Sequence, residues 1–146
     1  MNHYFNLYLS TERMYQNIMN TLTYENLHET KKHVSIQFPY NTYLCSIPLD
    51  FTQVPLHWHN DVEIIVIKKG CGIISVDTEP KVVKAGDIIL VRPGQLHSIA
   101  QHGKDRMEYE NILFQTSLLY SDDSDPCTVG YFHPYFSLEY ELPWLF

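Results

Sequence analysis

Between residues 34 and 114, short apolar runs of the chain alternate with clusters of turn residues. The segments 70–72 and 77–80 are predicted as turns, because Asp starts local turns and Gly and Pro interrupt strand ladders. Short strands at this spacing predict a mainly β fold, either a sandwich or a barrel. The predicted strands are residues 43–47, 56–59, 62–69, 73–76, 81–84, 87–91, 96–100 and 107–114.

An apolar stripe at helical spacing precedes this region and follows Thr11, a residue type that caps helices. It predicts a short N-terminal helix that packs against the core or an interface, and residues 24–32 predict a polar arm. We therefore expect an N-terminal helix and arm at residues 1–33 and one domain at residues 34–146. The stripe consists of Met14, Tyr15, Ile18, Met19 and Leu22.

After Phe114 the alternation of short apolar runs and turn residues ends. Residues 117–120 predict one helical turn, and residues 121–126 predict an acidic loop. The chain ends on Trp144, Leu145 and Phe146, and large apolar residues at this position predict a longer protein from which the sequence is cut. With the N-terminal stripe, they would also leave apolar surface on a monomer, which predicts a homodimer.

Side chains with metal-ligand chemistry lie near the ends of predicted strands. They are His57, His59, Glu63 and His97. Residues 57 and 59 are two apart on an extended segment and therefore point to the same face. Imidazoles and a carboxylate suit a divalent transition metal such as Zn²⁺, Ni²⁺ or Fe²⁺. Two other interpretations stay open, namely effector-binding groups that face a barrel cavity and a hydrogen-bonded polar cluster.

Three further residues bear on ligand binding. Tyr43, one predicted strand before the histidines, is the candidate stacking residue for the C–H face of a sugar. Arg92 could bind an anionic effector, but a single arginine beside a turn is expected to be solvated. Trp58 alternates with the two histidines and is expected to pack outside the barrel.

The spacing His-x-His-x3-Glu-x6-Gly resembles the first motif of the cupins. It is formed by His57, His59, Glu63 and Gly70. Residues 86–97 resemble the second motif, with Arg92 where the family has a proline and Gln101 where the motif ends in asparagine. The resemblance implies a cupin-type double-stranded β-helix, or jelly-roll barrel, with a short N-terminal helix and minor C-terminal helical turns.

Residues 34–146 also resemble the N-terminal regulatory domain of AraC-type transcription regulators. The resemblance is carried by HWH before an apolar strand, by GDIILVRPGQLHSI, and by YENILF followed by Ser117-Leu118-Leu119. It implies a barrel that binds a small effector, often a sugar, and a helical segment that mediates dimerisation. It also implies a pair of DNA-binding helix-turn-helix units that this chain lacks.

The net charge of −7 arises from the last part of the chain. All ten Lys and Arg lie before Met107 together with ten acidic residues, and the other seven acidic residues lie after it. DNA binding requires Lys and Arg to displace counterions from phosphates. We therefore expect that this chain does not bind DNA by itself.

With 146 residues, the chain has the size of one domain with one core. It has no run near the roughly 18 apolar residues of a membrane helix and no signal-peptide pattern at its start. Cys45, Cys71 and Cys127 lack CxxC spacing and are expected to be unpaired thiols, which predicts a cytoplasmic location. Cys71, between two glycines, is expected to be inert rather than a nucleophile.

Two classes of function remain open. The first is a non-catalytic domain that senses a small molecule, with a saccharide as the expected effector, and controls a separate DNA-binding domain. The second is a small metal-dependent cupin enzyme, such as a dioxygenase or sugar isomerase, in which the same ligands would leave coordination positions open. The segment from Tyr109 to Leu119 favours the sensing domain.

Overall fold

The computed structural model describes residues 20–21, 23–35, 37–120, 124–140 and 142–146. The predicted stripe from Met14 to Leu22 lies outside these residues. Of the predicted arm, residues 24–26 are helical and residues 29–35 are irregular where they are described. The described part of the chain then forms the strands β1 (Tyr40–Ile47), β2 (Gln53–His57), β3 (Val62–Val76), β4 (Glu79–Lys84), β5 (Ile88–Val91), β6 (His97–Gln101) and β7 (Met107–Phe114).

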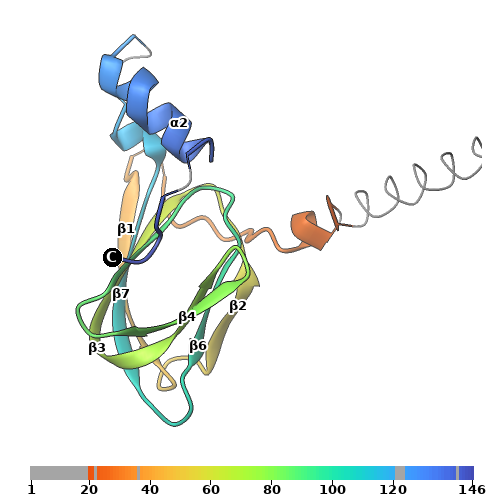
Figure 1. Cartoon of the computed structure of the whole chain (residues 1–146), viewed down its shortest axis with the longest axis vertical. Coiled ribbons are helices and arrows are strands. Elements are labelled where there is room, and N and C mark those ends of the chain that lie inside the picture. The colour runs from red at the N-terminus through yellow and green to blue at the C-terminus, as the bar shows by residue number, and fades with distance from the viewer. Residues whose placement is uncertain (1–19, 22, 36, 121–123, 141) are drawn as a thin grey trace, which may run out of the picture.

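Strand β3 belongs to both sheets of a barrel. Its first half pairs antiparallel with β5 and β7, and β7 pairs with β1. Its second half pairs antiparallel with β4 and β6, and β6 pairs with β2. The two sheets curve around one interior (Figure 1). The prediction of a mainly β fold is confirmed.

Strand β3 bends at Gly70, where it passes from one sheet to the other. Gly70 has a φ of +73°, and a Cβ at this position would meet the carbonyl oxygen of Arg106. The ladder nevertheless continues, since Gly70 lies opposite Met107 and Cys71 lies opposite Lys84. The predicted break at residues 70–72 is therefore wrong, because glycine here bends the strand without ending it.

The turn between β3 and β4 is shorter than the predicted turn at residues 77–80. Asp77 and Thr78 have φ values of +48° and +68°, as in a two-residue hairpin turn. Glu79 and Pro80 already belong to β4. Among the described strands β4 pairs only with β3, so the proline lies on an edge strand, where its missing N–H leaves no ladder bond unmade.

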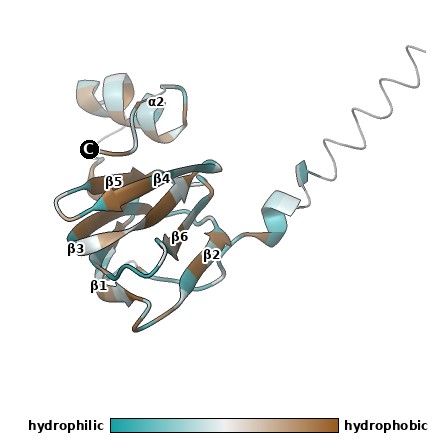
Figure 2. Ribbon diagram, turned by 60° about the horizontal axis from the view of Figure 1, so that its bottom comes forward, coloured by the Kyte–Doolittle hydropathy of each residue, from teal (hydrophilic) through white to brown (hydrophobic). Residues whose placement is uncertain are grey.

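The core fills the space between the two sheets. Burial alternates along the first and last parts of β3, as expected for a strand with one face inside. The strands carry most of the hydrophobic colouring in Figure 2. The buried core residues are Ile47, Ile65, Ile67, Ile74, Val76, Val83, Ile89, Val91, Ile99, Met107 and Tyr109.

After β7 the chain forms short helical segments and then returns to the barrel. These segments are η1 (Thr116–Leu118), η2 (Thr128–Phe132) and α2 (His133–Phe136), and α2 lies at one end of the barrel (Figure 1). The last residues add to the edge of β5, since Ile88 and Phe146 exchange two hydrogen bonds of 2.9 Å. Trp144 and Leu145 pack against the core. None of the helices in the described residues is long and apolar enough to span a membrane.

Arg92 joins the C-terminal segment to the barrel, and the expectation that it is solvated is wrong. The residue is 9% exposed. Its Nη1 donates hydrogen bonds to the carbonyl oxygens of Tyr135, at 3.1 Å, and Tyr140, at 2.8 Å. Its Nε donates to Oε1 of Gln95, and its guanidinium lies 5.0 Å from the ring centre of Tyr135. Burial is possible because these acceptors replace the water that the charge loses.

Replacing Arg92 by alanine is expected to lower the free energy of unfolding by about 2–3 kcal/mol, since hydrogen bonds from charged groups contribute about 1.5–3 kcal/mol. Amide hydrogens of residues 133–140 should exchange faster than in the wild type. Urea unfolding and hydrogen exchange measure the two effects. Arg106→Ala, which removes an exposed arginine, is the matched control. Equal stability and equal exchange in the two variants would contradict the anchoring role of Arg92.

Candidate functional site

The predicted ligand residues come together between the two sheets. His57 ends β2 and lies opposite His97, the first residue of β6. His59 follows in the loop that leads to β3, and Glu63, the second residue of β3, approaches from the other sheet. The ring centres of His57 and His97 are 4.1 Å apart, and those of His59 and His97 are 4.9 Å apart. We call these four residues the histidine cluster.

Backbone carbonyls fix the orientation of the three imidazoles. Nδ1 of His57 donates to the carbonyl of Pro55 at 2.8 Å, and Nδ1 of His59 donates to that of Asp61 at 3.0 Å. Nδ1 of His97 donates to the carbonyl of Gln95 at 2.9 Å. A carbonyl oxygen only accepts, so each Nδ1 carries the proton and each Nε2 is left to face the cluster. One ring nitrogen from each histidine lies within 4.8 Å of the others.

The carboxylate of Glu63 faces two of these Nε2 atoms. Its Oε2 lies 3.0 Å from Nε2 of His59 and 3.1 Å from Nε2 of His97. The Nε2 of His97 nevertheless has no hydrogen-bond partner among the described residues. Because Nδ1 of His59 already carries a proton, its close Nε2 contact with Glu63 requires a second proton or a cation between the two atoms.

Burial and the facing charges set the protonation of the cluster. Burial favours the neutral acid of Glu63, but the two imidazoles outweigh it and hold the pKa of this carboxyl below its usual range. Burial also opposes the charged form of His59, but the hydrogen bond to Glu63 outweighs it and raises the pKa of this histidine. The pKa of His57 is lowered by burial and by His97. Glu63 thus favours its anionic form, and it favours the protonated form of His59.

The histidine cluster forms part of the wall of a cavity of about 260 Å³ inside the barrel. His57, His59 and Glu63 line the cavity, whereas His97 belongs to the cluster and not to the lining. Tyr43, the predicted stacking residue, also lines the cavity, and its role in stacking stays a prediction. Its hydroxyl accepts a hydrogen bond from Asn41, and Nζ of Lys31 lies 5.0 Å from its ring centre. A ligand that stacks on this ring therefore has to share it with the lysine.

Two lining residues on β7 were missed by the sequence analysis. Tyr109 and Asn111 alternate with buried Leu113 on the inner face of the strand. The hydroxyl of Tyr109 and Oδ1 of Asn111 are buried and have no hydrogen-bond partner among the described residues. Burial raises the pKa of the Tyr109 hydroxyl, which keeps it protonated. The sequence could have identified these two residues, because positions 109, 111 and 113 of the predicted strand 107–114 share one face.

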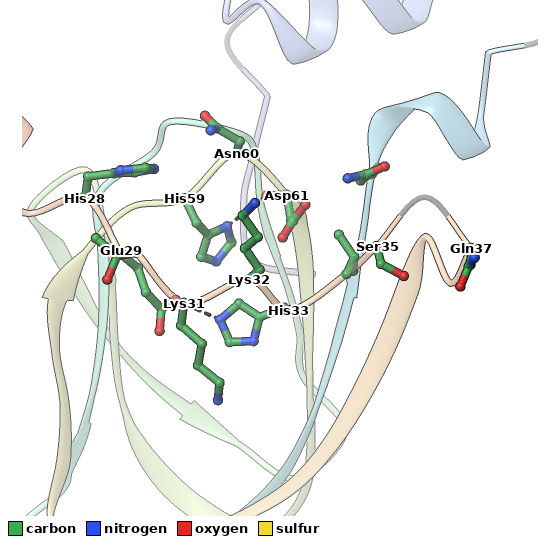
Figure 3. A pocket seen from close by; sticks show the side chains of 13 residues that line it. His28, Glu29, Lys31, Lys32, His33, Ser35, Gln37, His59, Asn60 and Asp61 are labelled. Carbon is green, nitrogen blue, oxygen red and sulfur yellow. Dashed lines mark hydrogen bonds and ion pairs between the residues drawn. The ribbon is translucent and has the colours of Figure 1, made fainter.

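The predicted N-terminal arm contacts the histidine cluster, and the sequence analysis missed this contact. Oε2 of Glu29 lies 2.9 Å from Nε2 of His33 and 3.8 Å from Nε2 of His57. Figure 3 shows Glu29 and His33 beside His59, in a second pocket of about 720 Å³ between the arm and the barrel. Trp58 packs outside the barrel, as expected, with its ring stacked 4.6 Å from that of Tyr24 in the arm.

Comparison with known proteins finds one matching family model and a similar transcription regulator. The family model for the AraC-like ligand binding domain matches residues 49–122. An uncharacterized HTH-type transcriptional regulator, YdeC of Bacillus subtilis, is 30% identical over 74 residues. That match spans 50% of this chain but only 25% of the regulator.

Two solved structures have a similar fold. A cupin protein from Bacteroides fragilis is 23% identical, with a TM-score of 0.52, and the match covers 57% of this chain and 72% of that protein. The cupin domain of Cnp3 from Schizosaccharomyces pombe is 15% identical, with a TM-score of 0.50, and the match covers 60% of this chain and 67% of that domain. The expected jelly-roll barrel of the cupins is confirmed.

Proposed function

The chain belongs to the AraC-like ligand binding domain family, and we propose that it is the effector-sensing domain of a transcription regulator. Its barrel would bind a small molecule and thereby control a separate DNA-binding domain. The histidine cluster and the cavity beside it are the site of binding in this proposal. A homodimer stays a prediction.

The unpartnered polar atoms in the cavity wall are the observation that carries this proposal. An unsatisfied buried polar group costs about 1–3 kcal/mol. The Tyr109 hydroxyl and Oδ1 of Asn111 lie on residues that line the cavity, and Glu63 lies opposite on the β3 side. A ligand with several hydroxyl groups would supply the missing partners. A few convergent polar groups in a mostly apolar wall are typical of small-molecule sites.

The size and chemistry of the cavity favour a small saccharide. Its volume of about 260 Å³ is below the roughly 300–1,000 Å³ of sites for drug-sized ligands. Such a volume favours a monosaccharide or a smaller polar molecule over an oligosaccharide. Imidazoles and a carboxylate are directional partners for hydroxyl groups, and Tyr43 offers an aromatic face.

We also propose that the histidine cluster binds a divalent transition metal such as Zn²⁺, Ni²⁺ or Fe²⁺. The residues fit, because the Nδ1 tethers turn each Nε2 inward and Nε2 of His97 has no other partner among the described residues. His57, His59 and His97 would hold the ion together with Glu63. A bound ion would supply a Lewis-acid centre for an oxygen atom of the ligand. The protein side chains would orient that ligand in the cavity.

A thermal-shift screen of monosaccharides, sugar phosphates and small acids tests the proposed function. A ligand at a hundredfold excess over Kd adds about 2.7 kcal/mol to the stability of the wild type. Tyr109→Phe removes only the unpartnered hydroxyl, so the free protein should be as stable as the wild type or more stable. Loss of one ligand hydrogen bond should raise Kd about tenfold, which reduces the added stability to about 1.4 kcal/mol.

Tyr40→Phe is the matched control, because Tyr40 is 60% exposed on β1. This variant should keep the full ligand-induced shift. A full shift in Tyr109→Phe would place the binding site outside the cavity. A screen in which no saccharide shifts the wild type would contradict the proposed effector class.

A metal-dependent enzyme is the second candidate function, and the histidine cluster is the observation that favours it. The same set of ligands could hold an ion with positions open to a substrate. The screen separates the two functions when each hit is incubated with the metal-loaded protein and analysed for products. An unchanged compound supports sensing, and a consumed compound supports the enzyme.

A further inference from the structure

A second group of metal-ligating side chains lies outside the cavity, where β3 meets the turn between β6 and β7. Sγ of Cys71 lies 3.1 Å from Oδ2 of Asp105 and 3.8 Å from Nδ1 of His102. Nδ1 of His102 lies 3.0 Å from the same Oδ2. Cys71 is partly buried, and the side chains of His102 and Asp105 are 45% and 54% exposed. We call these three residues the thiol cluster.

The fold holds the backbone of the thiol cluster in place. The amide of Cys71 donates to the carbonyl of Arg106 at 3.1 Å, a close approach that Gly70 permits because it has no Cβ. The amide of Asp105 donates to the carbonyl of His102 at 2.9 Å, and Nε2 of Gln101 donates to the carbonyl of Asp105 at 3.0 Å. The turn is thus tied both to itself and to β3, so the three side chains meet without a ligand to gather them.

We propose that Cys71, His102 and Asp105 bind a borderline-soft divalent cation of the zinc type. Thiolate, imidazole and carboxylate are ligands of Zn²⁺, with bonds of about 2.3, 2.0–2.1 and 2.0–2.2 Å. In a tetrahedral site these bond lengths place the ligand atoms about 3.4–3.6 Å apart. The observed separations of 3.0, 3.1 and 3.8 Å therefore need to change by only a few tenths of an ångström. Water would occupy the fourth position.

The charges balance when the ion binds. In the metal-free cluster the Cys71 thiol keeps its proton and donates a hydrogen bond through it to the Asp105 carboxylate. The ion takes the place of this proton, which leaves to the solvent, and the thiolate becomes a ligand. One thiolate and one carboxylate neutralise a dication, so the loaded site carries no net charge at the protein surface. The sequence-based expectation that Cys71 is inert as a nucleophile is compatible with this role.

The thiol cluster is separate from the histidine cluster. His97 begins β6 and His102 follows its last residue, so the two lie about 16 Å apart along the strand at about 3.3 Å per residue. The turn between β6 and β7 lies at the bottom of the barrel in Figure 1, away from α2. The two clusters have no residue in common, and none of the four side chains of the histidine cluster contains sulfur. Because the free cysteine Cys45 lines the cavity beside the histidine cluster, a thiolate signal is assigned to the thiol cluster by its loss in Cys71→Ser.

Titration of the reduced, metal-free full chain with Co²⁺ tests this proposal. The wild type should develop a thiolate-to-cobalt charge-transfer band, and added Zn²⁺ should abolish it. Cys71→Ser should lose the band, and His102→Ala should raise the Kd for Co²⁺ by at least about tenfold. Cys127→Ser, which removes an exposed free cysteine, is the matched control and should keep the band.

Alkylation of the wild type gives a second readout that needs no variant. Zn²⁺ should slow the modification of Cys71 relative to Cys127, as measured by mass spectrometry of the two peptides. A band that survives in Cys71→Ser, or a Co²⁺ affinity no higher than that of reduced glutathione, would overturn the proposal. Equal alkylation of Cys71 with and without Zn²⁺ would also overturn it. The comparison with Cys71→Ser and the alkylation of Cys71 separate these outcomes from metal or effector binding at the histidine cluster.

Discussion

Replacing Glu63 by glutamine should weaken the binding of Zn²⁺ at the histidine cluster by at least about 100-fold. Replacing a residue that only orients a metal ligand lowers metal affinity about 10–100-fold. Glu63 would be a ligand itself, so we expect an effect at least as large. The substitution removes the only carboxylate of the cluster but keeps the shape of the side chain. Its amide oxygen can still accept the hydrogen bond from His59, so the metal-free fold should persist.

Competition with a chromophoric chelator measures this affinity. A Cys71→Ser background removes the thiol cluster, so that a single class of site is titrated. Glu110→Gln is the matched control, because Glu110 is a partly exposed carboxylate on β7 that pairs with Lys68 at 3.2 Å. This control should bind Zn²⁺ as the parent does. If Glu63→Gln binds Zn²⁺ as tightly as its parent, Glu63 is not a ligand, and the proposed four-residue metal site is contradicted.

Replacing Gly70 by alanine is expected to lower the free energy of unfolding by about 4 kcal/mol or more. This is the largest loss of stability that we expect from a single substitution in this chain. A φ of +73° costs an L-residue about 1–2 kcal/mol by itself. The new Cβ would also meet the carbonyl oxygen of Arg106, and backbone cannot move aside as the end of a flexible side chain can. Losses above about 4 kcal/mol are exceptional and indicate a specific structural cause of this kind.

Gly86→Ala separates the two parts of this effect. Gly86 has a φ of +100°, but a Cβ there would meet nothing within 4 Å. The free energy of unfolding of Gly86→Ala should therefore fall by only about 1–2 kcal/mol, the cost of backbone strain alone. Urea unfolding of the two variants at equal temperature and pH gives the comparison. Equal losses would mean that the contact with Arg106 contributes nothing and that the backbone angle explains both.

The strands show how far periodicity predicts this fold. The predicted strand at residues 107–114 matches the bounds of β7, and the other predicted strands overlap observed ones. The errors fall at turns. Gly70 was taken as a break and is a bend, and Pro80 was taken as part of a turn and lies on the edge strand β4. A single sequence names the residue types that favour turns, but it does not say whether a neighbouring strand is present to continue the ladder.

The spacing of His57, His59, Glu63 and His97 was sufficient to propose that these side chains converge, and the structure brings them together. Period-2 alternation and one bend relate His57, His59 and Glu63 along the chain, so local rules apply to these three. His97 lies on another predicted strand, and the resemblance of residues 86–97 to the second cupin motif placed it with them. The thiol cluster shows the opposite case. Cys71 is 31 residues from His102 in the sequence, and only the pairing of β3 with β6 and β7 makes them neighbours. No spacing rule within one segment predicts that contact.

The sequence by itself determined the β architecture, the identity of the clustered ligands and the position of the negative charge, because these follow from local patterns and composition. Only the tertiary structure decided what surrounds each group. It buried Arg92 under the carbonyls of Tyr135 and Tyr140, left the Tyr109 hydroxyl without a partner among the described residues, and placed Glu29 beside His57. Burial and partners depend on segments distant in the chain, and the free energy of a polar group depends on both.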